Sequence, residues 1–212
     1  MKDDRIHEEH AAMDDVRSLR VFSWIAPVYG LFYQRQKRHY ESVLDAVLPQ
    51  IDLSPYRSVL DVGCGTGALC AVLSQRGHTV TGIDPVRKML AIAASHTLEN
   101  PVGLVRASVL ERLPFDDKSF DVVIASYVAH GLKEDDRKVM YAEMDRIARY
   151  LVVFHDYNHR RAIITDLVEW FEGGDYFNFV KKARPEMKAH FRDVRVIDVS
   201  KRAAWYICVP NE

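Results

Sequence analysis

Three glycines alternate along one short segment, at positions 63, 65 and 67, directly after an apolar run that contains Asp61. Glycine tolerates positive φ angles and lets a ligand approach the backbone, and the first N–H groups of a helix have no partner within that helix. An apolar strand followed by this turn and a helix predicts a site for a nucleotide-like cofactor. A turn without a ligand would not require three alternating glycines, because each one costs chain entropy on folding.

Two classes of cofactor compete for this turn. The segment from Gly63 to Ala68 satisfies the dinucleotide pattern G-x-G-x-x-G/A, and Asp84 follows after about 20 residues, as that pattern requires. Asp61 argues against a dinucleotide, because a carboxylate beside the close-approach glycines would repel a pyrophosphate. S-adenosylmethionine carries an ammonium and a sulfonium group and no phosphate, so acidic residues at the ends of the first two strands would attract it.

The same residues carry a resemblance to a known family. The motif Val59-Leu60-Asp61-Val62-Gly63-Cys64-Gly65-Thr66-Gly67 resembles the first motif of the class I S-adenosylmethionine-dependent methyltransferases, and Val80-Thr81-Gly82-Ile83-Asp84-Pro85 is similar to their second-strand motif. Leu113-Pro114-Phe115 and the run 119–126 are similar to the entry into their fourth strand. The resemblance covers residues 29–157. Within the family, the chain looks most like the small-molecule type that modifies quinone precursors and other metabolites.

The resemblance implies roles for residues at the strand ends. Asp61 would contact the methionine end of the cofactor, or would cap neighbouring amides; Asp84 would hold the ribose hydroxyls, or would cap the helix that follows. Ser108 stands where the family usually has an acidic residue that reads the adenine amino group, and Glu111 is its rival. The expected cofactor-binding residues are Tyr29, Asp61, Gly63, Cys64, Gly65, Thr66, Gly67, Asp84, Pro85, Met89, Ser108, Val109, Ser126 and Tyr127. Met89 and Val109 would enclose the adenine ring, or would be core residues.

Titratable side chains follow the fourth and fifth expected strands. They are His130 after the fourth, and His155, Asp156 and Tyr157 after the fifth. Strand carboxyl ends border the ligand crevice of an open α/β sheet, so these residues are candidates for a general base that removes a proton from the methyl acceptor. An imidazole that titrates near neutrality suits this task. His130 could instead cap its loop, and Asp156 could cap a helix expected from about residue 159.

Aromatic residues flank this core on both sides. Ala26-Pro27-Val28-Tyr29 resembles the family's entry motif, with Gly30 where aspartate is usual, and it belongs to an expected N-terminal cover over residues 21–48. An expected acceptor-side insertion at 160–190 contains Gly173-Gly174 as a hinge for a lid. The aromatic residues of these two segments include Trp24, Tyr29, Phe32, Tyr33, Trp170, Phe171, Tyr176, Phe177 and Phe179. They indicate an apolar or aromatic acceptor, although plain hydrophobic packing would also use them.

Helices and strands are expected to alternate along most of the chain. Strands are predicted at 58–62, 79–83, 102–106, 120–126 and 150–155, and helices at 34–48, 67–76, 86–96, 134–148 and 160–172, with helical structure continuing to about residue 190. This order predicts a Rossmann-like, doubly wound, mostly parallel α/β sheet. Two closing strands at 194–199 and 204–209 are separated by a link too short for a parallel crossover, so the last strand must be antiparallel. The family fold implies seven strands with this ending.

Composition limits the remaining possibilities. A chain of 212 residues with 48% hydrophobic content suits one domain, expected at 21–212 after a polar, mobile or loosely docked lead-in at 1–20. The 29 basic and 30 acidic residues give no field that attracts nucleic acid. Cys64, Cys70 and Cys208 show no metal spacing, and the chain lacks a signal peptide or a membrane-length apolar run, which predicts a cytoplasmic protein with free thiols. His7 and His10 read as a solvated helix face, so no metal is expected.

The leading hypothesis is methyl transfer from S-adenosylmethionine to a small acceptor, with S-adenosylhomocysteine as the product. A sensor or scaffold that binds the cofactor without turnover is the alternative that Ser108 and Gly30 suggest. An NAD-dependent oxidoreductase is disfavoured by Asp61 and by the closing pair of strands. The acceptor atom, the use of a base and the choice between monomer and homodimer stay open.

Overall fold

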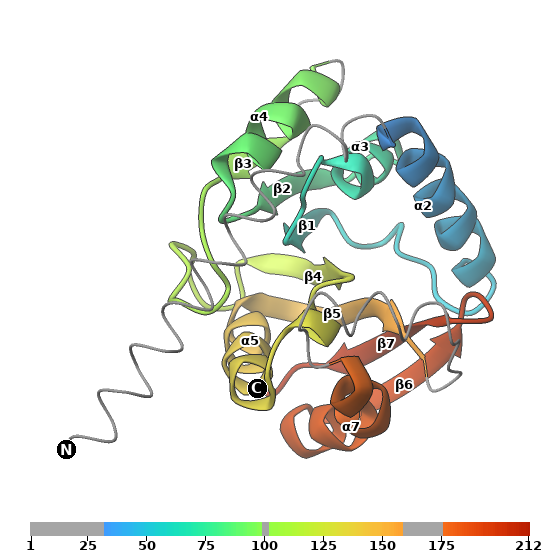
Figure 1. The fold of residues 1–212 in the computed structure, drawn as a ribbon, viewed down its shortest axis with the longest axis vertical. Helices are drawn as coiled ribbons and strands as arrows, with labels where there is room; N and C mark the ends of the chain where they lie inside the picture. Colours follow the sequence, from blue (N-terminus) through green and yellow to red (C-terminus); the bar gives the residue numbers. More distant parts are fainter. Residues whose placement is uncertain (1–31, 99–101, 159–175) are drawn as a thin grey trace.

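A seven-stranded sheet forms the centre of the molecule (Figure 1). The computed structural model describes residues 32–98, 102–158 and 176–212. The strands are β1 (Ser58–Val62), β2 (Thr79–Ile83), β3 (Gly103–Val105), β4 (Phe120–Ser126), β5 (Ala148–Tyr157), β6 (Asp193–Asp198) and β7 (Ala203–Val209), in the spatial order β3-β2-β1-β4-β5-β7-β6. The first five are parallel, and β7 is antiparallel to both β5 and β6. The predicted fold class is confirmed.

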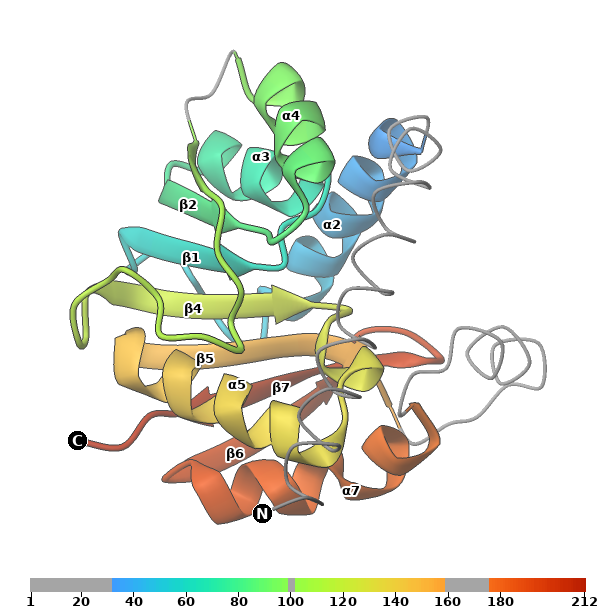
Figure 2. The same cartoon turned by 60° about the vertical axis from the view of Figure 1, so that its left-hand side comes forward.

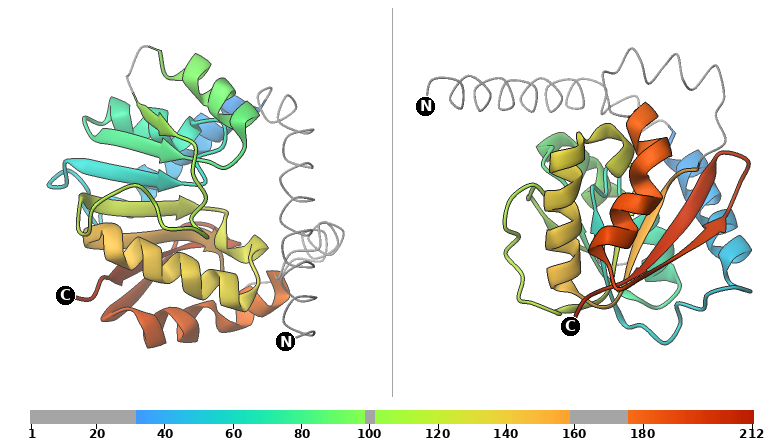
Figure 3. Two further views of the ribbon diagram at one scale, coloured as in Figure 1. Left: turned by 90° about the vertical axis from the view of Figure 1, so that its left-hand side faces the viewer. Right: turned by 90° about the horizontal axis from the view of Figure 1, so that it is seen from below.

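Helices cover both faces of this sheet, as a parallel sheet requires (Figure 3). They are α2 (Tyr33–Val47), α3 (Ala68–Gln75), α4 (Arg87–His96), the short η1 (Ala129–Gly131), α5 (Glu134–Ile147) and α7 (Tyr176–His190). Helices α2 and α3 lie together on one face, whereas α5 and α7 lie together on the other (Figures 2 and 3).

Alternating strand residues build two hydrophobic cores. Val122 and Ile124 of β4 pack toward the side of α2 and α3, together with Val43, Leu44 and Val47 of α2. Their neighbours Val123 and Ala125 pack on the opposite side, with Met140 and Met144 of α5 and Phe179, Ala183 and Met187 of α7. Because side chains alternate in this way, successive polar residues at the carboxyl ends of β4 and β5 also lie on opposite faces of the sheet.

Two strands differ in length from their predictions. β5 runs for ten residues instead of the predicted 150–155, so His155, Asp156 and Tyr157 lie inside the strand and not after it. At its carboxyl end the cause is the antiparallel ladder with β7, which pairs Asp156 with Ala204 and Tyr157 with Ala203, beyond the point where the apolar pattern stops. At its start, Ala148 pairs with Phe120 of β4. β3 has three residues instead of five, since it is an edge strand paired only with β2. The other described elements begin and end within a residue of their predicted bounds.

Several predictions fall outside the described residues. They concern the lead-in at 1–20, the cover as far as residue 31 and the predicted helix at 160–172. The domain boundary at residue 21 therefore stays a prediction. Within the described ranges, no helix combines the length and the apolar character needed to cross a membrane.

Candidate active site

The glycine turn directly follows β1, and its glycines have left-handed backbone angles. Gly63 has φ +71°, and a Cβ added there would lie 2.6 Å from Cγ2 of Val128, in the loop after β4. Gly65 has φ +52°, and no atom lies within 4 Å of its added Cβ. Gly63 is therefore required by protein packing, whereas the backbone of Gly65 borders open space that a ligand can approach. Gly67, at φ +76°, occupies the N-cap position of α3 and packs closely against Ala93 of α4.

Asp84 ties the end of β2 to this turn. Its Oδ2 accepts a hydrogen bond of 3.0 Å from the Gly65 N–H, and its Oδ1 accepts one of 2.8 Å from the Val86 N–H. The Cys64 N–H also donates to the Ile83 carbonyl, at 2.9 Å. Asp84 is not the N-cap of α4, because that helix begins at Arg87 and Val86 occupies its N-cap position. A carboxylate has about four acceptor positions, so the two bonds leave capacity for ligand hydroxyls.

Asp61 is a buried carboxylate, with 1% of its surface exposed. The Cys70 thiol donates a hydrogen bond of 3.1 Å to its Oδ2, and no backbone amide among the described residues does so; the amide-capping alternative is therefore wrong for this part of the chain. Burial raises the pKa of Asp61 to about 7, opposed by the Cys70 bond and assisted by the negative charge of Asp84. A neighbouring cation would favour the charged form.

Helix α2 reaches over the turn through two residues that the sequence interpretation did not single out. The Thr66 hydroxyl donates to Oε1 of Gln36 at 2.8 Å, and the Ser126 hydroxyl donates to the Tyr40 hydroxyl at 3.1 Å. Gln36 and Tyr40 are four residues apart, on a helix whose buried stripe continues at Val43 and Leu44. Gln36 and Tyr40 extend the apolar stripe of this helix toward its N-terminus, and that position could have indicated them from the sequence.

The residues expected around adenine lie in helix α4, which follows β2, and in the loop after β3. Met89 and Val109 are both buried but belong to different hydrophobic clusters. Ser108 is half-buried and its hydroxyl accepts a hydrogen bond of 3.3 Å from the Leu110 N–H, whereas Glu111 is exposed. Pro85 is half-buried, and its carbonyl accepts a bond from Arg106. Ser108 is therefore the more buried of the two polar candidates.

His130 and Asp156 form a close pair between the loop after β4 and the end of β5. Nδ1 of His130 lies 2.8 Å from Oδ1 of Asp156, and the His130 backbone N–H donates to Oδ2 at 3.3 Å. The Tyr157 N–H donates to Oδ1 at 2.8 Å. Asp156 is 1% exposed, and the His130 side chain is 12% exposed. The pair therefore combines a buried carboxylate with an imidazole close to the surface of the site.

Aromatic rings surround this pair. Tyr157 meets His130 edge-on with ring centroids 4.8 Å apart, and Tyr127 lies 5.4 Å from Tyr157. Two residues of α7 continue the group, since Tyr176 lies 5.0 Å from Tyr157 and Phe179 lies 6.5 Å from His130. Tyr127 has φ +54°, an uncommon angle for a residue with a side chain, and its N–H donates to the His155 carbonyl at 2.8 Å. Burial raises the pKa of Tyr127 to about 12.

His155 has different surroundings from the other three predicted catalytic candidates. Its Nδ1 lies 3.0 Å from the Ser126 hydroxyl, and its ring stacks on His39 of α2 with centroids 5.7 Å apart. Burial and the nearby His39 lower the pKa of His155 to about 3, so it is neutral at ordinary pH. The fold thus groups His130, Asp156 and Tyr157 and directs His155 toward α2.

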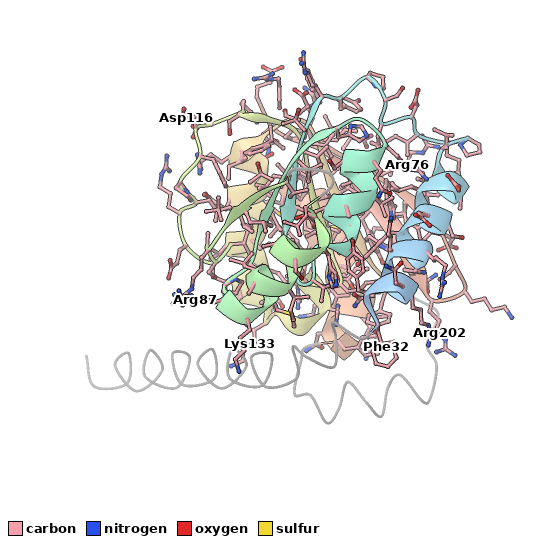
Figure 4. All side chains as sticks on the ribbon, turned by 90° about the horizontal axis from the view of Figure 1, so that it is seen from above. Phe32, Arg76, Arg87, Asp116, Lys133 and Arg202 are labelled. Atoms are coloured by element: carbon pink, nitrogen blue, oxygen red, sulfur yellow. The ribbon has the colours of Figure 1, made fainter. Side chains whose placement is uncertain are left out.

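Some predicted site residues cannot be placed. Tyr29, Trp24 and Gly30 lie outside the described residues, as do Trp170, Phe171 and the Gly173-Gly174 hinge. Phe32, at the start of α2, is 50% exposed and lies at the same margin of the molecule as Arg87, Lys133 and Arg202, which follow or precede strands at this end of the sheet (Figure 4).

Comparison with known proteins places this arrangement in a family. The chain is 23% identical over 190 residues to an uncharacterised methyltransferase of Staphylococcus carnosus, covering 84% of this chain and 87% of the relative. It is 42% identical over 79 residues to a ubiquinone biosynthesis O-methyltransferase of Agrobacterium fabrum, which covers 37% of this chain and only 32% of that relative. Its fold resembles that of magnesium protoporphyrin IX methyltransferase from Synechocystis PCC 6803, solved with bound SAH, at a TM-score of 0.60 and 16% identity over 82% of this chain and 83% of that one.

The family described as Methyltransferase domain matches residues 60–151, which contain the glycine turn, Asp84 and strand β4. Residues 60–151 belong to this methyltransferase family, and the protein is an S-adenosylmethionine-dependent methyltransferase. S-adenosylmethionine is the cofactor of this methyltransferase, and the NAD-dependent alternative is wrong.

The methyltransferase turn fits that cofactor on its own geometry. Gly65 offers backbone beside open space, and Asp61 is a buried carboxylate whose thiol partner is a weak donor. Both features favour a guest that carries positive charge and hydrogen-bond donors and no phosphate.

Proposed function

We propose that this methyltransferase modifies a small metabolite with an apolar or aromatic body, bound at the carboxyl ends of β4 and β5. The observation that carries the proposal is the group of rings formed by Tyr127, His130, Tyr157, Tyr176 and Phe179 around the buried Asp156. Pockets for small ligands are lined mainly by apolar and aromatic side chains with a few placed polar groups, and rings pack well against rings.

The cofactor is proposed to lie along the glycine turn. Asp61 would face its methionine end and Asp84 its ribose, while Ser108, Met89 and Val109 would surround the adenine. Ser126 and Tyr127, at the end of β4, would border the methyl group. The glycine turn with Cys64 and Thr66, together with Pro85 and Tyr29, completes the proposed set.

The bound cofactor supplies an electrophilic methyl group, so the protein needs no covalent catalyst. Its residues hold the acceptor in line and exclude water, which by effective-molarity reasoning contributes roughly 7–11 kcal/mol. The partial match to an enzyme named for O-methylation in ubiquinone biosynthesis supports a ring-bearing acceptor. The nearly balanced charge supports a small acceptor over nucleic acid.

A turnover assay tests this function. The purified chain is incubated with S-adenosylmethionine and a panel of phenols, quinols, aromatic amines and thiols, with polar aliphatic compounds of similar size as controls. Mass spectrometry should find methylated ring compounds and an equal amount of S-adenosylhomocysteine. Binding of S-adenosylhomocysteine in calorimetry without turnover of any panel member would overturn the proposal in favour of a sensor or scaffold.

A further inference from the structure

The bond between His130 and Asp156 fixes the tautomer of the imidazole. A carboxylate only accepts hydrogen bonds, so the hydrogen in the 2.8 Å contact lies on Nδ1 and the ring lone pair lies on Nε2. The backbone bonds from His130 and Tyr157 to the same carboxylate hold Asp156 in place. An imidazole arranged in this way accepts a proton at Nε2, and the carboxylate stabilises the imidazolium that forms.

Two other titratable groups among the described residues at this end of the sheet, His155 and Tyr127, are less suited to the task. His155 is buried against α2, and burial lowers its pKa to about 3, which makes it a very weak base. Burial raises the pKa of Tyr127 to about 12, with a smaller contribution from the Asp156 charge, so its phenol keeps its proton. From α7, the described neighbour of His130 is the uncharged ring of Phe179.

The presence of such a base narrows the acceptor chemistry. Near neutrality a carboxylate acceptor is ionised, an aromatic amine is uncharged and attacks through its lone pair, and a thiol with a pKa of about 8.5 is partly ionised without help. A phenol with a pKa of about 10 is almost wholly protonated, so it gains most from a positioned base. Burying a carboxylate beside the site costs free energy, and a methyltransferase for aromatic amines or carboxylates would have no need of it.

We propose that His130, positioned by Asp156, is the general base for O-methylation of a weakly acidic, ring-borne hydroxyl group. This inference rests on the proposed function and names its substrate class. The hydroxyl proton passes to Nε2 of His130 and later to solvent. S-adenosylmethionine supplies the methyl group, so that the acceptor oxygen forms the new C–O bond while the C–S bond breaks and its electron pair stays on sulfur.

A series of phenols of graded acidity tests the base. In His130→Gln, kcat/KM for weakly acidic phenols should fall by roughly 10²–10⁴-fold, whereas a nitrophenol that is already ionised at the assay pH should lose less than about tenfold. His78→Gln is the matched control, because His78 is also largely buried and bonded through Nδ1, to the Tyr56 carbonyl, away from the site. Its rates should equal those of the wild type.

A spectroscopic measurement avoids turnover altogether. A chromogenic phenol whose pKa is close to that of an imidazole is bound in the presence of S-adenosylhomocysteine, and its ultraviolet difference spectrum is recorded. The wild type and His78→Gln should shift the phenol toward the phenolate spectrum, and His130→Gln should not.

Asp156 is tested as a positioning residue through the pH profile. In the wild type, kcat/KM should fall on the acid side as His130 becomes protonated. Asp156→Asn removes the charge that favours the imidazolium, so the acid limb should move to lower pH while the maximal rate drops. Should Asp156→Asn fail to fold, the His130→Gln spectrum decides by itself.

Equal losses of kcat/KM in His130→Gln for protonated and ionised phenols would overturn the assignment of His130 as the general base. So would a phenol spectrum that does not change when the wild type binds it. Calorimetric binding of S-adenosylhomocysteine together with turnover of amines or thiols in that case would leave the proposed function intact. A wild type that methylates none of the ring compounds would overturn both.

Discussion

Arg137 and Glu186 join α5 to α7 through two hydrogen bonds of 2.8 Å, although the arginine side chain is fully buried. Nη1 of Arg137 also donates to the Leu132 carbonyl at 2.6 Å, directly after η1, which carries His130. The guanidinium lies 5.9 Å from the centre of the Phe179 ring. The buried guanidinium of Arg137 thus connects the loop that carries His130, helix α7 and the ring of Phe179.

Removing one partner of this pair should destabilise the fold. Arg137→Met leaves Glu186 without its cation, and breaking a buried pair in this way costs about 3–5 kcal/mol. Arg137→Met with Glu186→Leu should recover much of that loss, because the desolvated charge is gone. Urea denaturation, monitored by circular dichroism, measures the stability of the single and the double variant. The control is Lys182→Met, which breaks an exposed ion pair with Glu134 between the same helices and should cost at most about 1 kcal/mol. Equal losses in the single variant and the control would contradict the prediction.

Gly65→Ala should weaken cofactor binding more than it weakens the fold. The added Cβ meets no atom within 4 Å, so its structural cost is that of a left-handed alanine, about 1–2 kcal/mol. Gly77→Ala is a matched control, since Gly77 has φ +93° and open space around it, in the turn before β2. Both variants should lose similar stability in urea, and only Gly65→Ala should bind S-adenosylhomocysteine more weakly in calorimetry. Equal affinity in the two variants would count against a ligand at Gly65.

The sequence predicted β4 and β5 because each carries a continuous apolar run, as expected for parallel strands that helices cover on both faces. It predicted the antiparallel ending because the link between the last two strands is short. It missed the carboxyl end of β5, since Asp156 and Tyr157 are polar and pair with β7, whose position cannot be inferred from the pattern of β5. The residue pattern of one strand does not show how far a neighbouring strand will pair with it.

The sequence indicated which residues are candidates for the site, but it did not indicate which of them contact one another. His130, Asp156 and His155 were all chosen because they follow strand ends. Only the alternation of side chains along β5, together with the loop after β4, joins the first two and turns His155 toward Ser126. Gln36, Tyr40 and Arg137 were missed because their contacts are with elements distant in the sequence.

His155 should make the fold sensitive to mild acid. Its folded pKa of about 3 lies below the ordinary value of 6.5, chiefly through burial, so the unfolded chain binds the proton more readily. The stability that this neutral histidine contributes is present above pH 6.5 and is lost as the pH falls from there toward 3. The wild type should lose more stability than His155→Gln between pH 7 and pH 5, as measured by urea midpoints. Parallel losses would show that the imidazole accepts its proton without unfolding.

Asp61 should act in the opposite direction across the acid range. Burial raises its folded pKa from 3.8 to about 7, so the folded chain keeps a proton that the unfolded chain releases. Stability from this group is fully present below pH 3.8 and is lost as the pH rises toward 7. Asp61→Asn should abolish this contribution, so the variant should gain stability relative to the wild type as the pH is raised from 5 to 8. A constant difference would contradict the buried titration.

Cofactor binding should lower the pKa of Asp61 and so favour its charged form. If the carboxylate faces the ammonium group of the ligand, the charged form binds better and binding releases a proton near pH 6. Calorimetric titration with S-adenosylhomocysteine in buffers of different ionisation enthalpy measures that proton, and the affinity should rise from pH 6 to pH 8. Asp61→Asn should bind more weakly and without proton release, whereas Asp52→Asn, which changes an exposed carboxylate bonded to Ser54, should behave as the wild type. Identical proton release in Asp61→Asn and the wild type would place the ammonium group away from this carboxylate.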